Sequence, residues 1–81
     1  MARILMFGRL ADVAGWRERA LAEIPTSLSA LKAMLAAENP ALGAALAGRG
    51  VQVAVDKAIV RGDVPLGAGV EVAFLAPMSG G

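Results

Sequence analysis

The chemistry of this chain is concentrated in its last two residues, Gly80 and Gly81. They follow a proline at position 77, and no charged side chain stands between Glu71 and the end of the chain. The terminal α-carboxylate reacts only after activation. ATP can convert it to an acyl-adenylate, and a sulfur donor can then convert the adenylate to a thiocarboxylate. Because glycine has no side chain and a freely bending backbone, such an end can enter a narrow channel.

Cysteine and histidine are both absent from the 81 residues. Their absence removes disulfide and thiol chemistry, the usual ligands of zinc, iron and copper, and the commonest general base. We therefore expect a protein that is not catalytic alone and that binds no cofactor permanently. If such a protein carries sulfur, it must carry it at a group such as the C-terminal carboxylate.

Charge and hydropathy narrow the class of protein further. The net charge is +1, with eight basic residues that form no run, and only three residues are aromatic. Both features argue against a nucleic-acid partner. The longest uncharged runs reach ten residues, whereas a membrane-spanning helix needs about 20. The start of the chain lacks the apolar core of a signal peptide. We expect a cytoplasmic protein with no membrane partner.

The pattern of apolar residues predicts an α+β domain of five strands and one main helix. Strands are expected over residues 3–7, 16–24, 51–55, 58–60 and 70–75. The helix is expected within residues 25–40, where Leu28, Leu31 and Leu35 share one face. Residues 8–15, bounded by glycines, are expected to be a connection.

Capping residues mark the ends of the helical region. Thr26 or Ser27 can cap the first turn of the main helix. Asn39 can cap a second, short helix that has Pro40 at its first position and stops at Gly48.

One helix between runs of strands is typical of a mixed sheet with the helix on one face. The β-grasp, or ubiquitin-like, fold is one such arrangement. We expect residues 1–75 to form this domain and residues 76–81 to form a flexible Gly-Gly tail.

The first and last strands are expected to present an apolar patch on the open face of the sheet. Side chains alternate along a strand, and Arg3 and Glu71 should face water. The same faces then carry Leu5, Phe7, Ala73 and Leu75. The patch is either partly covered by loops or a docking surface for a partner, and the adjacent tail favours docking.

Four segments give the chain a resemblance to a known family. They are "ILMFGRLADVAG", "PTSLSALKAML", "VAVDKAIV" and "PLGAGVEVAFLAPMSGG". The chain resembles the small subunit of molybdopterin synthase, a ubiquitin-like sulfur carrier, over essentially its whole length. The terminal block is the specific part of this resemblance.

The resemblance implies a mechanism centred on Gly81. An E1-like adenylyltransferase would consume ATP to adenylate Gly81, and a sulfurtransferase step would make the thiocarboxylate. The tail would then enter the large synthase subunit, in a heterotetramer of two small and two large subunits. There sulfur would pass to precursor Z, cyclic pyranopterin monophosphate, to build the molybdopterin dithiolene. Gly80 would give clearance, and the channel would be lined by Ala76, Pro77, Met78 and Ser79.

Three other functions stay open. The chain could carry sulfur for another pathway, such as thiamine, thiolated tRNA or cysteine synthesis. It could be a ubiquitin-like modifier joined to lysines of target proteins. It could also be an interaction domain whose Gly-Gly end is incidental. Carriers of the thiamine type are usually shorter around residues 40–50, which favours the molybdopterin reading.

Overall fold

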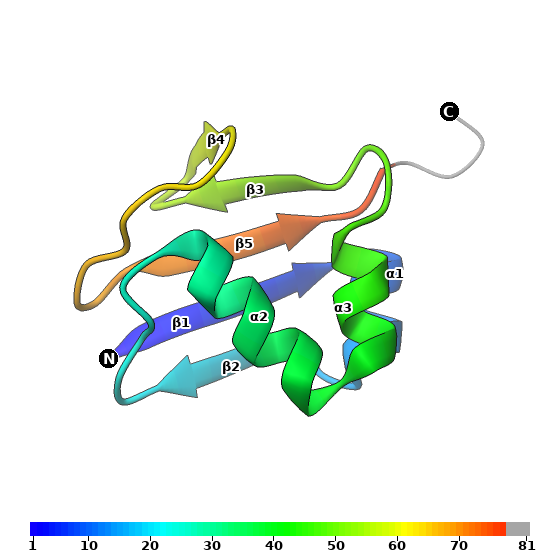
Figure 1. Cartoon of the computed structure of the whole chain (residues 1–81), viewed down its shortest axis with the longest axis horizontal. Helices are drawn as coiled ribbons and strands as arrows, with labels where there is room; N and C mark the ends of the chain where they lie inside the picture. The colour runs from blue at the N-terminus through cyan, green and yellow to red at the C-terminus, as the bar shows by residue number, and fades with distance from the viewer. Residues whose placement is uncertain (78–81) are drawn as a thin grey trace.

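The computed structural model describes residues 1–77, which form one sheet with helices packed against it (Figure 1). The strands are β1 (Ala2–Phe7), β2 (Glu18–Leu21), β3 (Gln52–Val55), β4 (Ala58–Val60) and β5 (Glu71–Leu75). The helices are α1 (Arg9–Ala14), α2 (Leu28–Glu38) and α3 (Pro40–Leu46). The sheet order is β2-β1-β5-β3-β4, and only the central pair, β1 and β5, is parallel. This mixed sheet with one main helix confirms the predicted β-grasp fold.

The main helix, α2, begins where its side-chain cap predicts. Of the two candidate caps, Ser27 is the one used: its backbone is extended, and its hydroxyl accepts the amide of Ala30 at 3.2 Å. Asp63, from the distant loop before β5, accepts the amide of Ser29 at 2.8 Å. Two of the amides that a helix start leaves unpaired are thereby satisfied. One face of α2 is buried against the sheet through Leu28, Leu31 and Leu35.

The short helix α3 also begins and stops as predicted. The Asn39 side chain accepts the amide of Leu42 at 3.1 Å, and Pro40 occupies the first turn. The helix ends at Leu46 and is followed by Ala47 in a right-handed conformation. The amide of Ala47 still donates to the carbonyl of Gly43 at 3.2 Å, as in a helix, whereas the amide of Gly48 donates to the carbonyl of Ala45 at 3.1 Å. The helical hydrogen-bonding pattern therefore stops at Gly48, as predicted.

Residues 8–15 are not a plain connection, and that prediction was wrong. Arg9–Ala14 form the helix α1, closed by Gly15 in the left-handed region at φ 84°. The helix is only six residues long, so its own periodicity is weak. It is held by tertiary packing, because Leu10 is buried in the core and contacts run to β1 and α3.

The hydrophobic core lies between the sheet and the helices. Phe74, Ile4 and Val72 are fully buried on the helix side of the two central strands. Among residues 1–77, no polar or charged residue is buried. The predicted strand 16–24 is present as the shorter β2, and Trp16 lies outside it, partly buried against the core. No helix within the described residues is long and apolar enough to span a bilayer.

Candidate functional site

The end of β5 delivers the root of the predicted tail to one edge of the molecule (Figure 1). Ala76 is partly buried and packs against the core, while Pro77 is exposed. The remaining predicted tail residues lie outside the described part of the chain, namely Met78, Ser79, Gly80 and Gly81. The roles predicted for the tail residues stay predictions.

Two glycines border the tail root. A Cβ atom on Gly8 would lie 3.3 Å from the Cβ of Ala76, and one on Gly50 would lie 3.1 Å from the Cβ of Pro77. Both glycines have positive φ, at 64° and 79°, a region that L side chains enter at a cost. The two positions are thus adapted both to a tight turn and to a close approach by Ala76 and Pro77. We call this pair the glycine slot.

The open face of the sheet gathers the predicted docking residues. In the register, Leu5 is opposite Ala73 and Phe7 is opposite Leu75. The side chain of Phe7 is 49% exposed, whereas Ala73 is only 8% exposed. Ala73 lies between Leu5 of β1 and Ala54 of β3, and it contributes little accessible surface. The structure brings the four residues together, and their role in docking stays a prediction.

Two further residues, which were not predicted from the sequence, extend this group of docking residues across the sheet. Ala54 pairs with Ala73 across β3 and β5, and Ile59 pairs with Ala54 across β3 and β4. Ile59 is 53% exposed, which makes it one of the most exposed large apolar side chains of the described residues. The hairpin signal at Asp56 and Lys57 could have located it, since a two-residue turn fixes the register. The apolar patch therefore comprises Leu5, Phe7, Ala54, Ile59, Ala73 and Leu75.

The same face becomes polar away from the tail root. Arg3 on β1 forms ion pairs with Glu18 of β2, at 3.2 Å, and with Glu71 of β5. These exposed pairs tie three neighbouring strands together, and each contributes little to stability. A third ion pair lies on the helix-covered side of the sheet, where Arg19, opposite Ile4 in the register, joins β2 to Glu38 of α2. The hydrogen bond from the Arg19 guanidinium lowers the pKa of the Glu38 carboxyl. The apolar end of the face is thus the end nearest the tail.

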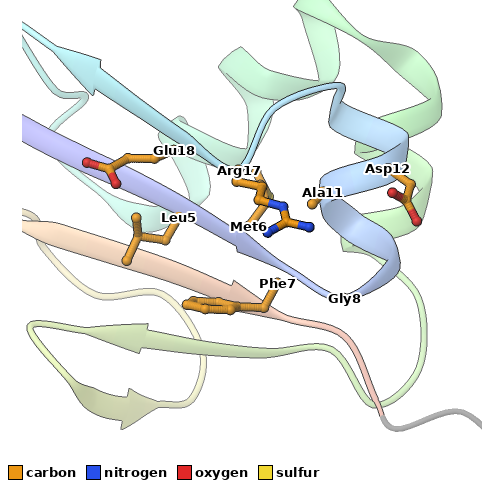
Figure 2. Close-up of a pocket in the computed structure, with 8 residues that line it drawn as sticks. All are labelled: Leu5, Met6, Phe7, Gly8, Ala11, Asp12, Arg17 and Glu18. Atoms are coloured by element: carbon orange, nitrogen blue, oxygen red, sulfur yellow. The ribbon is translucent and has the colours of Figure 1, made fainter.

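A recess of about 680 Å³ opens beside the apolar patch (Figure 2). It is lined by Leu5, Met6, Phe7, Gly8, Ala11, Asp12, Arg17 and Glu18. Figure 2 shows Leu5 and Phe7 projecting from β1, Asp12 on α1, and the Arg17 side chain reaching toward that helix. The recess combines an apolar wall with both signs of charge, which suits a protein side chain better than a metal ion. Among residues 1–77, no three acidic side chains gather at a possible metal site.

Comparisons with known proteins agree with this architecture. The model of the ThiS family matches residues 4–81. The crystal structure of small archaeal modifier protein 1 from Haloferax volcanii is similar at a TM-score of 0.82 and 24% identity, over 99% of this chain and 98% of that chain. The solution structure of small archaeal modifier protein 1 from Methanosarcina acetivorans is similar at 0.82 and 20% identity, over 99% and 95%. No curated protein matches the sequence significantly.

Proposed function

The chain belongs to the ThiS family of small ubiquitin-like sulfur carriers, and on that premise we propose that its sulfur is carried on the carboxylate of Gly81. The observation that carries the proposal is the extent of the family match, which runs from residue 4 to the last residue. The match therefore includes the Gly-Gly end as well as the folded body. The absence of cysteine supports the same reading, because no side-chain thiol is available to hold sulfur.

The proposed reaction begins with activation of the terminal carboxylate. One carboxylate oxygen of Gly81 attacks the α-phosphorus of ATP, pyrophosphate leaves, and an acyl-adenylate forms. Sulfur at the oxidation level of hydrosulfide then attacks the acyl carbon, AMP leaves, and the product is a thiocarboxylate. Both steps take place on an E1-like activating enzyme, which the family membership implies as a partner. This chain supplies the reacting group and its presentation, and the catalytic side chains belong to the partner.

The body of the domain has two tasks in this proposal. The glycine slot sets the position from which the tail leaves the body, because Ala76 and Pro77 lie against it. The apolar patch begins beside the tail root, at Phe7 and Leu75, and offers exposed Phe7 and Ile59 to a partner. Exposed apolar patches of this kind mark protein–protein contacts. We propose that activating and sulfur-accepting enzymes dock here in turn, on residues that include Leu5 and Leu75.

The molecule that accepts the sulfur is a separate part of the proposal. The family match and the likeness to proteins named as modifiers favour a carrier for another pathway, or a modifier joined to lysines, over the molybdopterin reading. The sequence resemblance to the small subunit of molybdopterin synthase keeps precursor Z as a specific candidate acceptor. One feature favours it over a thiamine-type acceptor: residues 40–46 form a complete helix, α3, in the region where thiamine-type carriers are usually shorter.

The first experiment is the intact mass of the protein isolated from its native host. A species heavier by the difference between one sulfur and one oxygen atom, localised to the C-terminal peptide, would establish the thiocarboxylate. Removal of Gly81 should abolish it. The matched variant Gly81→Ala keeps the length and the carboxylate, so it should retain adenylation in part. An unmodified mass after incubation with the activating enzyme, ATP and a sulfide donor would refute the proposal.

Incubation of the thiocarboxylate form with candidate acceptors then separates the pathways. Dithiolene formation from precursor Z in the presence of a large synthase subunit would assign the molybdopterin role. Isopeptide adducts on lysines of other proteins would assign the modifier role instead.

A further inference from the structure

A second groove borders the tail root and shares no residue with the recess beside the apolar patch. Its volume is about 420 Å³, and it lies between α1, α3 and the loop that leads into β3. The residues that line it are Arg9, Leu10, Val13, Ala44, Ala45, Gly48, Arg49, Val51, Ala76 and Pro77. We call it the tail-root groove. Because Ala76 and Pro77 form part of its wall, anything that occupies it touches the start of the tail.

Among the described residues, the only charges that line this groove are the guanidinium groups of Arg9 and Arg49. Both residues are exposed. Within residues 1–77, neither side chain has a hydrogen bond or an ion pair, whereas Arg3 and Arg19 are both paired with carboxylates. The groove therefore has an apolar floor and two guanidinium groups free to bind carboxylates.

The tail has no charged side chain that a partner could recognise. No charge follows Glu71 until the terminal carboxylate, and that carboxylate is consumed in the reaction. A partner that recognises this tail by charge must therefore use the body beside it. Arg9 and Arg49 are the charged residues placed in contact with the same groove as Ala76 and Pro77.

We propose that the tail-root groove binds an acidic segment of the activating enzyme and that Arg9 and Arg49 determine specificity for it. The inference rests on the proposed function and adds a second contact to the apolar patch. The segment that fits has one or two carboxylates next to small apolar side chains, matching the two guanidinium groups and the floor of Leu10, Val13 and Val51. Contacts in the groove and on the apolar patch would hold the tail root from two sides. Complementary charges at the rim of an interface act mainly on the rate of association and on the choice of partner.

The test is ATP–pyrophosphate exchange by the activating enzyme of the same organism, with the concentration of the full-length carrier varied. Arg9→Glu with Arg49→Glu should raise the KM for the carrier by roughly tenfold or more and leave kcat unchanged. The salt dependence of KM should become shallower, because fewer opposite charges meet. Arg9→Lys with Arg49→Lys should restore most of the affinity, which a purely structural role would not predict.

The matched control is Lys57→Glu with Arg61→Glu, which makes the same change in net charge on exposed residues outside the groove. Circular dichroism melting curves should show that both double variants fold. Equal KM values for the groove variant and the control would overturn the proposal. So would a defect confined to the later transfer of sulfur to an acceptor, since the groove would then serve that partner. No exchange with the wild-type carrier would instead refute the proposed function, and this inference with it.

Discussion

Pro77 packs so closely on Gly50 that a Cβ atom at position 50 would lie 3.1 Å from the Cβ and 3.3 Å from the Cγ of the proline. Gly50 also has a φ of 79°. The last turn before β3 and the first residues after β5 are therefore adapted to each other. The relationship links the conformation of a loop in the body to the place where the tail departs.

We expect Gly50→Ala to impair thiocarboxylate formation more than it impairs folding. The left-handed backbone should cost about 1–2 kcal/mol in the free energy of unfolding. The new methyl group must also displace Pro77, which shifts the root of the tail. Urea denaturation measures the first effect, and the rate of thiocarboxylate formation measures the second.

Gly62→Ala is the control for this experiment. Gly62 has a similar φ of 73°, but a Cβ there would meet no atom within 4 Å. The Gly62→Ala variant should lose a similar free energy of unfolding to Gly50→Ala but should form the thiocarboxylate at the normal rate. Equal rates for the two variants would show that contact with Pro77 does not position the tail.

We expect Gly43→Ala to destabilise the fold by about 1–3 kcal/mol through overpacking. A Cβ at position 43 would lie 2.5 Å from the Cβ and 2.9 Å from the Cα of Ala36, where α3 crosses α2. Helix propensity alone would favour alanine over glycine here by about 1 kcal/mol. Urea denaturation distinguishes the two effects, because a more stable variant would show that the helices separate at little cost.

Substitutions on the apolar patch should separate binding from folding. Phe7→Ser and Ile59→Ser remove apolar side chains that are about half exposed, so both variants should remain folded and bind the activating enzyme more weakly. Phe74→Ala removes a fully buried ring and should cost about 3–5 kcal/mol of stability. Calorimetric titration with the partner and thermal melting give the two readouts. Unchanged affinity in both serine variants would remove the patch from the interface.

The pH dependence of stability should contain a contribution from Asp63. Hydrogen bonds from the backbone amide and the hydroxyl of Ser29 lower the pKa of the Asp63 carboxyl in the folded protein. A lowered pKa stabilises the fold above the unfolded value of about 3.9, and this stabilisation is lost as the pH falls through the folded value.

Asp63→Asn should therefore be less stable than the wild type at neutral pH, and the difference should shrink as the solution becomes strongly acidic. Free energies of unfolding measured at a series of pH values give the comparison. Glu23→Gln, on an exposed carboxylate elsewhere, is the control. A pH-independent difference for Asp63→Asn would mean that its charge does not stabilise the start of α2.

Much of the fold was predictable because its signals are local. Ser27 and Asn39 cap the two helices as their positions predicted. Alternation along β1 and β5 correctly placed Phe7 and Leu75 together on the open face, since successive strand residues point to opposite sides. The order of strands and helices that follows from such signals was enough to predict the β-grasp fold.

The sequence by itself determined the order of the strands and the two capped helices, because each depends on residues close together in the chain, and it predicts the proposed chemistry at Gly81 for the same reason. The tertiary structure decided what surrounds the tail root. It made α1 a helix through the burial of Leu10. It brought Gly8 and Gly50 to the tail root and placed Arg9 and Arg49 on one groove. The segment around Gly8, the segment around Gly50 and the end of β5 are far apart in the sequence, and only the packing of the chain brings them together.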